Sequence, residues 1–96
     1  MSFQEKSRKA NDWSLNLEDE YYVDHVEELV ADAVKGVDET EKGFYVNLVT
    51  PAGCGDPASW LIPRLELILP AMEIGFERIE YVDQCGCGGF VTRVYR

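Results

Sequence analysis

Residues 44–50, Phe44-Tyr45-Val46-Asn47-Leu48-Val49-Thr50, decide the fold of this chain. Five of its seven side chains are aromatic or β-branched, and such side chains suit a pleated β-sheet surface. Asn47 is its one strongly polar member. We therefore predict a central β-strand that is covered on both faces. The strand should end in a loop that needs the freedom of glycine, Pro51-Ala52-Gly53-Cys54-Gly55.

Three further strands are expected around this one. Apolar and polar residues alternate over residues 13–17, which predicts a short strand with Trp13, Leu15 and Leu17 on its buried face. Residues 76–83 and 90–95 predict a third and a fourth strand. The short Cys-Gly loop between the last two strands predicts that they form a hairpin.

Two helical regions separate the first three strands. The first should be capped by Asp19 and terminated by Gly36. Its apolar stripe has helical spacing and consists of Tyr22, Val26, Leu29, Val30 and Ala33. The second should begin at Asp56-Pro57, with the proline at the first helical position. Because Pro63 and Pro70 interrupt it, we expect two short helices or one kinked helix.

The element order is therefore βαβαββ, which predicts an α/β (α+β) fold. The expected architecture is a two-layer sandwich: a four-stranded mixed sheet with helices on one or both faces. A minimal thioredoxin-like core is the alternative. Residues 1–11 are predicted to form a flexible tail, and residues 12–96 to form a single domain.

Charge and hydropathy narrow the range of partners. The net charge is -9, which argues against nucleic acid, whose phosphates require Lys and Arg. The chain has no apolar stretch that could span a membrane, and the polar amino end lacks the apolar core of a secretory signal, so we expect a cytoplasmic protein. Residues 18–41 hold ten acids and one base, Lys35. They form either a solvated face or a docking surface for a basic partner.

The carboxyl end carries the motif Cys85-Gly86-Cys87-Gly88-Gly89. If the first three strands are parallel, their carboxyl ends share one edge of the sheet, which would bring Cys54, Cys85 and Cys87 together. Three thiolates, with His25 or Asp83 as a fourth ligand, could bind zinc or copper(I). A second hypothesis is thiol redox or sulfur transport, since a disulfide within Cys-Gly-Cys would be strained.

A third hypothesis makes the motif a substrate. The Cα–H bond of glycine is weak because the flanking amide and carbonyl stabilise the resulting radical. A cysteine thiol beside it can then form a thioether or a related crosslink. We find no phosphate-binding loop, nucleophile elbow or catalytic dyad in the sequence, so we do not expect an enzyme.

The run Tyr81-Val82-Asp83-Gln84-Cys85-Gly86-Cys87-Gly88-Gly89, followed by Val91, Arg93 and Arg96, resembles the small archaeal and bacterial proteins named after this CGCGG motif. The resemblance extends to residues 13–20 and 43–50. Proteins of this family are described as ribosomally made peptide products (RiPPs) that a partner radical S-adenosylmethionine (SAM) enzyme modifies. The resemblance implies that Cys85, Gly86, Cys87, Gly88 and Gly89 are the modified segment. The resemblance does not give the modification and assigns no role to Cys54, and for this hypothesis we expect no cofactor bound by the chain itself.

Overall fold

The computed structural model describes residues 9–84 and 89–96. Its helices and strands follow one another as β1 (Trp13–Asn16), α1 (Val26–Asp38), β2 (Tyr45–Thr50), α2 (Leu61–Ala71), β3 (Arg78–Gln84) and β4 (Phe90–Tyr95). Short 3-10 turns precede the helices, namely η1 (Glu20–Asp24), η2 (Ala52–Cys54) and η3 (Pro57–Ser59). The expected α+β fold and its βαβαββ order are confirmed.

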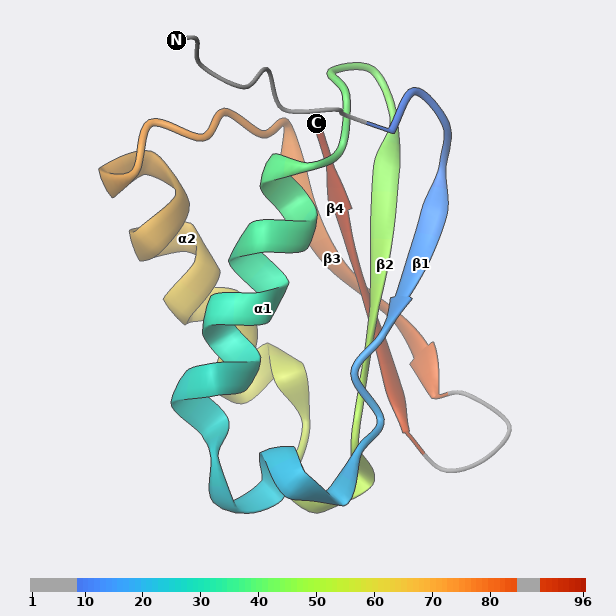
Figure 1. Ribbon diagram of the computed structural model, residues 1–96, viewed down its shortest axis with the longest axis vertical. Coiled ribbons are helices and arrows are strands. Elements are labelled where there is room, and N and C mark those ends of the chain that lie inside the picture. Colours follow the sequence, from blue (N-terminus) through green and yellow to red (C-terminus); the bar gives the residue numbers. More distant parts are fainter. Residues whose placement is uncertain (1–8, 85–88) are drawn as a thin grey trace, which may run out of the picture.

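The four strands form one mixed sheet in the order β1-β2-β4-β3. β1 pairs with β2 in parallel, whereas β4 pairs antiparallel with both β2 and β3. β1, β2 and β3 therefore run in one direction, and their carboxyl ends lie at the same end of the sheet (Figure 1). This arrangement confirms the direction expected for the first three strands and the hairpin expected for the last two.

Both helices pack on the same face of the sheet and form the second layer (Figure 1). The core between the layers consists of Leu17, Leu29, Val30, Ala33, Val34, Val37, Val46, Leu48, Leu61, Leu65, Leu69, Ile74 and Val94. Burial alternates along β2, with Val46, Leu48 and Thr50 buried and the intervening residues half-buried. The prediction that β2 is covered on both faces is wrong, because neither helix lies over its second face.

The predicted caps are found, but they cap 3-10 turns rather than α-helices. The Asp19 carboxylate accepts a hydrogen bond from the Tyr21 N–H at 2.9 Å, and Asp56 accepts one from Ala58 at 3.0 Å. α2 is a single helix, so the alternative of two short helices is wrong, and Pro70 lies inside the helix, one residue before its end. Pro63 lies in its first turn, where a backbone N–H has no partner within the helix. Within the described ranges, neither helix is long and apolar enough to cross a membrane.

Gly36 does not terminate the first helix, which continues to Asp38. A Cβ at Gly36 would lie 2.6 Å from Cδ2 of Leu15, well inside van der Waals contact. The glycine therefore lets α1 approach β1 closely. The correction has a physical reason, since a missing side chain can serve close packing as well as a left-handed helix end.

The predicted tail over residues 1–11 lies mostly outside the described residues, which begin at Lys9. Lys9 forms a parallel bridge with Thr40. Its N–H donates to the Glu39 carbonyl at 2.7 Å, and its carbonyl accepts from the Glu41 N–H at 2.9 Å. The chain is thus attached to the turn after α1 from Lys9 onward.

Candidate functional site

The candidate site is the end of the sheet where β1, β2 and β3 finish (Figure 1). Glu18 follows β1, Thr50 closes β2, and Gly89 precedes β4. Gly89 is the residue of the predicted segment that the structure describes. Cys85, Gly86, Cys87 and Gly88 lie outside the described residues. The geometry of the site therefore rests on Gly89 and on the residues around it.

Gly89 is buried against two neighbours from distant parts of the chain. A Cβ placed on it would lie 2.6 Å from the Thr50 carbonyl oxygen and closer still to the Glu18 carboxylate. Thr50 pairs with Phe90 at the end of the β2–β4 ladder, and its hydroxyl donates to the Phe90 carbonyl at 3.4 Å. Any side chain at position 89 would collide with backbone, so the fold requires glycine there.

An open groove of about 620 Å³ borders Gly89. Its walls come from the segment after β1 with η1, and from the segment after β2 with η2. They consist of Glu18, Glu20, Val23, Asp24, Pro51, Ala52, Gly53 and Gly89. Among the described residues that line it, three side chains are carboxylates and none is basic, so the field of the groove favours cations over anions. The groove belongs to the acidic region that the sequence places at residues 18–41.

Cys54 lies in η2, half-buried against the core. Its thiol donates a weak hydrogen bond to the Tyr22 carbonyl, with 3.8 Å between sulfur and oxygen. Burial raises the pKa of the Cys54 thiol, because desolvation disfavours the thiolate. The neutral form of the Cys54 thiol is therefore favoured over the thiolate more than in a free cysteine, which makes it a weaker nucleophile.

His25 lies at the junction between η1 and α1, where its side chain contacts Tyr21. Its Nδ1 lies 2.7 Å from the Tyr21 carbonyl oxygen, and its ring stacks on the Tyr21 ring at 3.9 Å. Across residues 9–84 and 89–96, no group of three or more His, Cys, Asp or Glu side chains could hold a metal ion. His25, Cys54 and Asp83 therefore do not form a metal site by themselves. The thiolate metal site stays a prediction, because two of its ligands lie outside the described residues.

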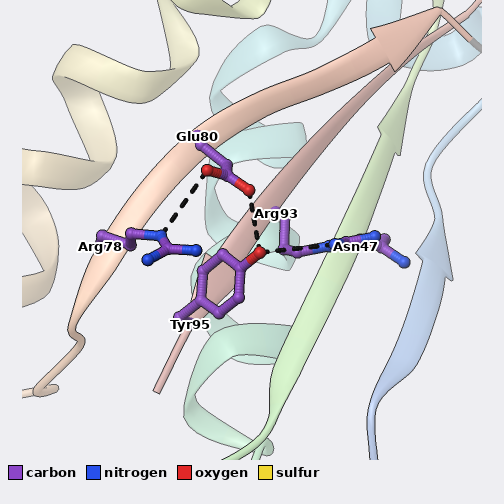
Figure 2. Close-up of polar contacts among 5 residues, drawn as sticks. All are labelled: Asn47, Arg78, Glu80, Arg93 and Tyr95. Carbon is purple, nitrogen blue, oxygen red and sulfur yellow. Dashed lines mark hydrogen bonds and ion pairs between the residues drawn. The ribbon is translucent and has the colours of Figure 1, made fainter.

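A polar network that was not predicted from the sequence lies on the helix-free face of the sheet (Figure 2). Nε of Arg93 donates to Oδ1 of Asn47 at 2.8 Å, and the Tyr95 hydroxyl donates to Oε2 of Glu80 at 2.9 Å. The Arg93 guanidinium also lies 4.1 Å from the Tyr45 ring centroid. These contacts cover the second face of β2 in place of a helix. Their only signal in the sequence is the alternation of polar residues along three separate strands.

A family model described as "Putative radical SAM target protein" matches residues 3–96 of the chain. The match spans every helix and strand and includes the carboxyl-terminal motif. Neither the curated proteins nor the solved structures include a significant match.

Proposed function

We propose, on the premise that this chain belongs to the radical SAM target family, that it is a folded substrate rather than an enzyme. A partner radical SAM enzyme would modify its segment Cys85-Gly86-Cys87-Gly88-Gly89. The observation that carries the proposal is the extent of the family match, which covers the folded part of the chain together with the motif. The match supports a target that is presented on a fold.

The described fold supports this proposal through the position of the hairpin. Gln84 and Phe90 are the last pair of the β3–β4 ladder, so the motif connects two paired strands at one end of the sheet. The core cluster is drawn from residues 17–74 and from Val94, outside the motif. Chemistry on the motif would therefore leave the packing between the helices and the sheet intact.

The residue types of the motif suit radical chemistry. Removing a hydrogen atom from a glycine Cα gives a radical that the adjacent amide and carbonyl stabilise. Attack by a neighbouring cysteine sulfur then forms a C–S bond. Overall, one C–H and one S–H bond are replaced by one C–S bond. The hydrogen atom from carbon would pass to the radical derived from SAM, the thiol hydrogen would leave as a proton, and the remaining electron would pass to an iron–sulfur cluster of the enzyme. Each crosslink would lower the mass of the protein by two hydrogens.

The test is the intact mass of protein purified from cells in which the partner enzyme is active. We expect a loss of two hydrogens per crosslink that survives a strong reductant, which a disulfide would not. Protein made in a foreign host without the enzyme gives the unmodified reference mass. An unmodified mass from cells with the active enzyme would refute the proposal.

Cysteine variants locate the chemistry. Cys85→Ala and Cys87→Ala should lose the crosslink to whichever sulfur they remove. Cys54→Ala is the matched control, because Cys54 belongs to η2 and not to the motif. It should keep the full loss of mass. If Cys54→Ala abolishes the modification, the assignment to the carboxyl-terminal segment is wrong.

A further inference from the structure

We propose that the outer face of the helix layer is a docking surface for an amphipathic helix of a partner protein, one that carries basic residues beside its apolar face. The surface consists of the open groove between α1 and α2 together with the exposed apolar side of α2. It contains no residue of the carboxyl-terminal motif and none of the groove beside Gly89. The inference therefore does not depend on the proposed function.

The first observation is that α2 carries apolar residues on every side. Its only charged residues are Arg64 and Glu66. The side that packs on the core is fully buried and consists of Leu61, Leu65 and Leu69. The opposite side is exposed and uncharged, and it consists of Pro63, Leu67, Pro70 and Ala71. A helix that is apolar all round is normally buried all round, whereas the described residues cover α2 on one side only.

The exposed apolar residues of α2 are contiguous. The Leu67 side chain is 76% exposed and that of Met72 is 58% exposed. Ala71 lies one helical turn from both Leu67 and Ile68, and Ile68 lies one turn from Met72, so the four residues are surface neighbours. Single apolar residues on a surface are ordinary, but a contiguous patch marks a site of contact. The flexible side chain of methionine suits such a site.

The patch continues into the groove between the two helices, which lie side by side and run in the same direction (Figure 1). The groove has a volume of about 320 Å³, and the described residues that line it are Glu27, Val30, Ala31, Val34, Ile68 and Met72. The Glu27 carboxylate lies 2.8 Å from the Arg64 guanidinium, and this ion pair connects the first turns of the helices. The rest of the lining is apolar. An open groove of this kind accepts the apolar face of a helix.

The charges beside the groove favour a basic occupant. The exposed side of α1 carries three acids and one base, namely Glu27, Glu28, Asp32 and Lys35. Tyrosine hydroxyls donate to Glu28 and Asp32, which leaves both carboxylates charged. A helix in the groove would thus meet acids along α1 and apolar residues along α2, so Lys or Arg on its α1 side would be attracted. A second copy of the chain fits less well, because two molecules of net charge -9 repel each other.

The test is an NMR titration of isotope-labelled protein with a synthetic peptide. The probe is an amphipathic helix of about 15 residues, with leucines on one face and lysines on the other. A matched peptide carries glutamates in place of the lysines. We expect the lysine peptide to bind and to shift the backbone signals of Ala31, Ile68 and Met72. No binding, or shifts confined to other parts of the protein, would overturn the proposal. Equal binding of both peptides would overturn the choice of a basic partner.

Two variants locate the contact. Leu67→Gln should weaken binding of the lysine peptide at least about tenfold, which is the effect of losing one buried leucine from an interface. It should leave the protein folded, because the Leu67 side chain is mostly exposed. Val82→Thr is the matched control, since Val82 is an exposed apolar residue of β3 and not of the helix layer. It should bind like the parent chain. A folded Leu67→Gln protein with the affinity of the parent would remove this face as the docking surface.

Sedimentation of the protein alone tests the competing occupant. We expect a monomer at the concentrations used in the titration, because the net charge opposes self-association. A dimer that Leu67→Gln dissociates would assign the face to a second copy of the chain and overturn the partner helix as its occupant.

Discussion

Thr92→Val should make the protein more stable. Thr92 lies in the middle of β4, paired with Leu48 of β2 and Tyr81 of β3. Its side chain is fully buried, and its hydroxyl oxygen has no hydrogen-bond partner among the described residues. Valine has nearly the same shape and suits a strand equally well. The substitution therefore removes an unsatisfied polar atom and leaves the packing in place.

The magnitude follows from the cost of the unpaired hydroxyl. A buried polar group without a partner costs about 1–3 kcal/mol of stability. Taking the lower end, because a strand can shift slightly to relieve the group, we expect Thr92→Val to add about 1 kcal/mol to the free energy of unfolding. In a domain of this size, this gain corresponds to a rise in Tm of about 4–8 °C.

The control is the same substitution at Thr40, which is equally buried but fully bonded. Its hydroxyl accepts from the Trp13 indole N–H at 2.8 Å and donates to the Gly36 carbonyl at 2.9 Å. Thr40→Val leaves both partners unpaired and should cost about 2 kcal/mol. The same substitution, threonine to valine, is thus expected to raise the free energy of unfolding at position 92 and to lower it at position 40.

Thermal and urea denaturation, followed by circular dichroism, measure both variants on one scale. The reasoning fails if Thr92→Val lowers Tm. That result would mean that the Thr92 hydroxyl is satisfied in solution, for example by a buried water. The reasoning also fails if the two variants shift Tm in the same direction. The hydrogen bonding of the hydroxyl would then not decide whether the substitution stabilises or destabilises the protein.

Three further predictions concern single side chains. The hydrogen bond to Asp32 raises the pKa of Tyr22 to about 12. This bond therefore stabilises the fold fully below about pH 10, and its contribution is lost as pH rises through about 12. In urea denaturation between about pH 10 and 12, the stability of Tyr22→Phe should fall less steeply with pH than that of the parent chain. Because burial raises the pKa of the Cys54 thiol, iodoacetamide should alkylate Cys54 more slowly than free cysteine at pH 8, and an equal rate would contradict this. Arg93→Met should cost about 1–2 kcal/mol through its lost ring and hydrogen-bond contacts, whereas Arg64→Met, which breaks an exposed ion pair, should change stability by less than about 1 kcal/mol.

Local patterns in the sequence are sufficient for most of the fold. Alternation over residues 13–17 and 90–95 identifies the strands, and the stripe through Leu29 and Ala33 identifies the face of α1 that packs on the sheet. These patterns work because each depends only on the period of its own element. The order of elements then restricts the topology, since parallel strands need a crossover connection.

The errors occur where one residue type has several physical uses. Gly36 was expected to end a helix, but it lets α1 pack against Leu15, which lies far away in the sequence. Asp19 caps a 3-10 turn, and nothing in the sequence near it specifies that α1 begins only at Val26. The open face of β2 was missed for a similar reason, because the partner of Asn47 is Arg93 on another strand.

The candidate site also depends on contacts between residues that are distant in the sequence. The motif is conspicuous in the sequence, whereas the enclosure of Gly89 by Glu18 and Thr50 is not. That enclosure exists only when the ends of β1 and β2 meet the start of β4. Sequence reasoning therefore selects the motif as the candidate site but gives no steric reason for any of its glycines. The structure describes Gly89 and supplies that reason at this position.

The described surroundings of Cys54 bear on the choice between a modified segment and a thiolate metal site. A metal site that uses Cys54 needs its thiolate, yet burial raises its pKa and its S–H is engaged by the Tyr22 carbonyl. The acids that line the groove beside Gly89 would not favour a thiolate there either, because negative charges raise thiol pKa values. Under the proposed function the modified segment lies outside η2, so radical maturation requires nothing of Cys54. The surroundings of Cys54 in the described, metal-free fold therefore agree with the proposed modification and give no separate support to a site that recruits its thiolate.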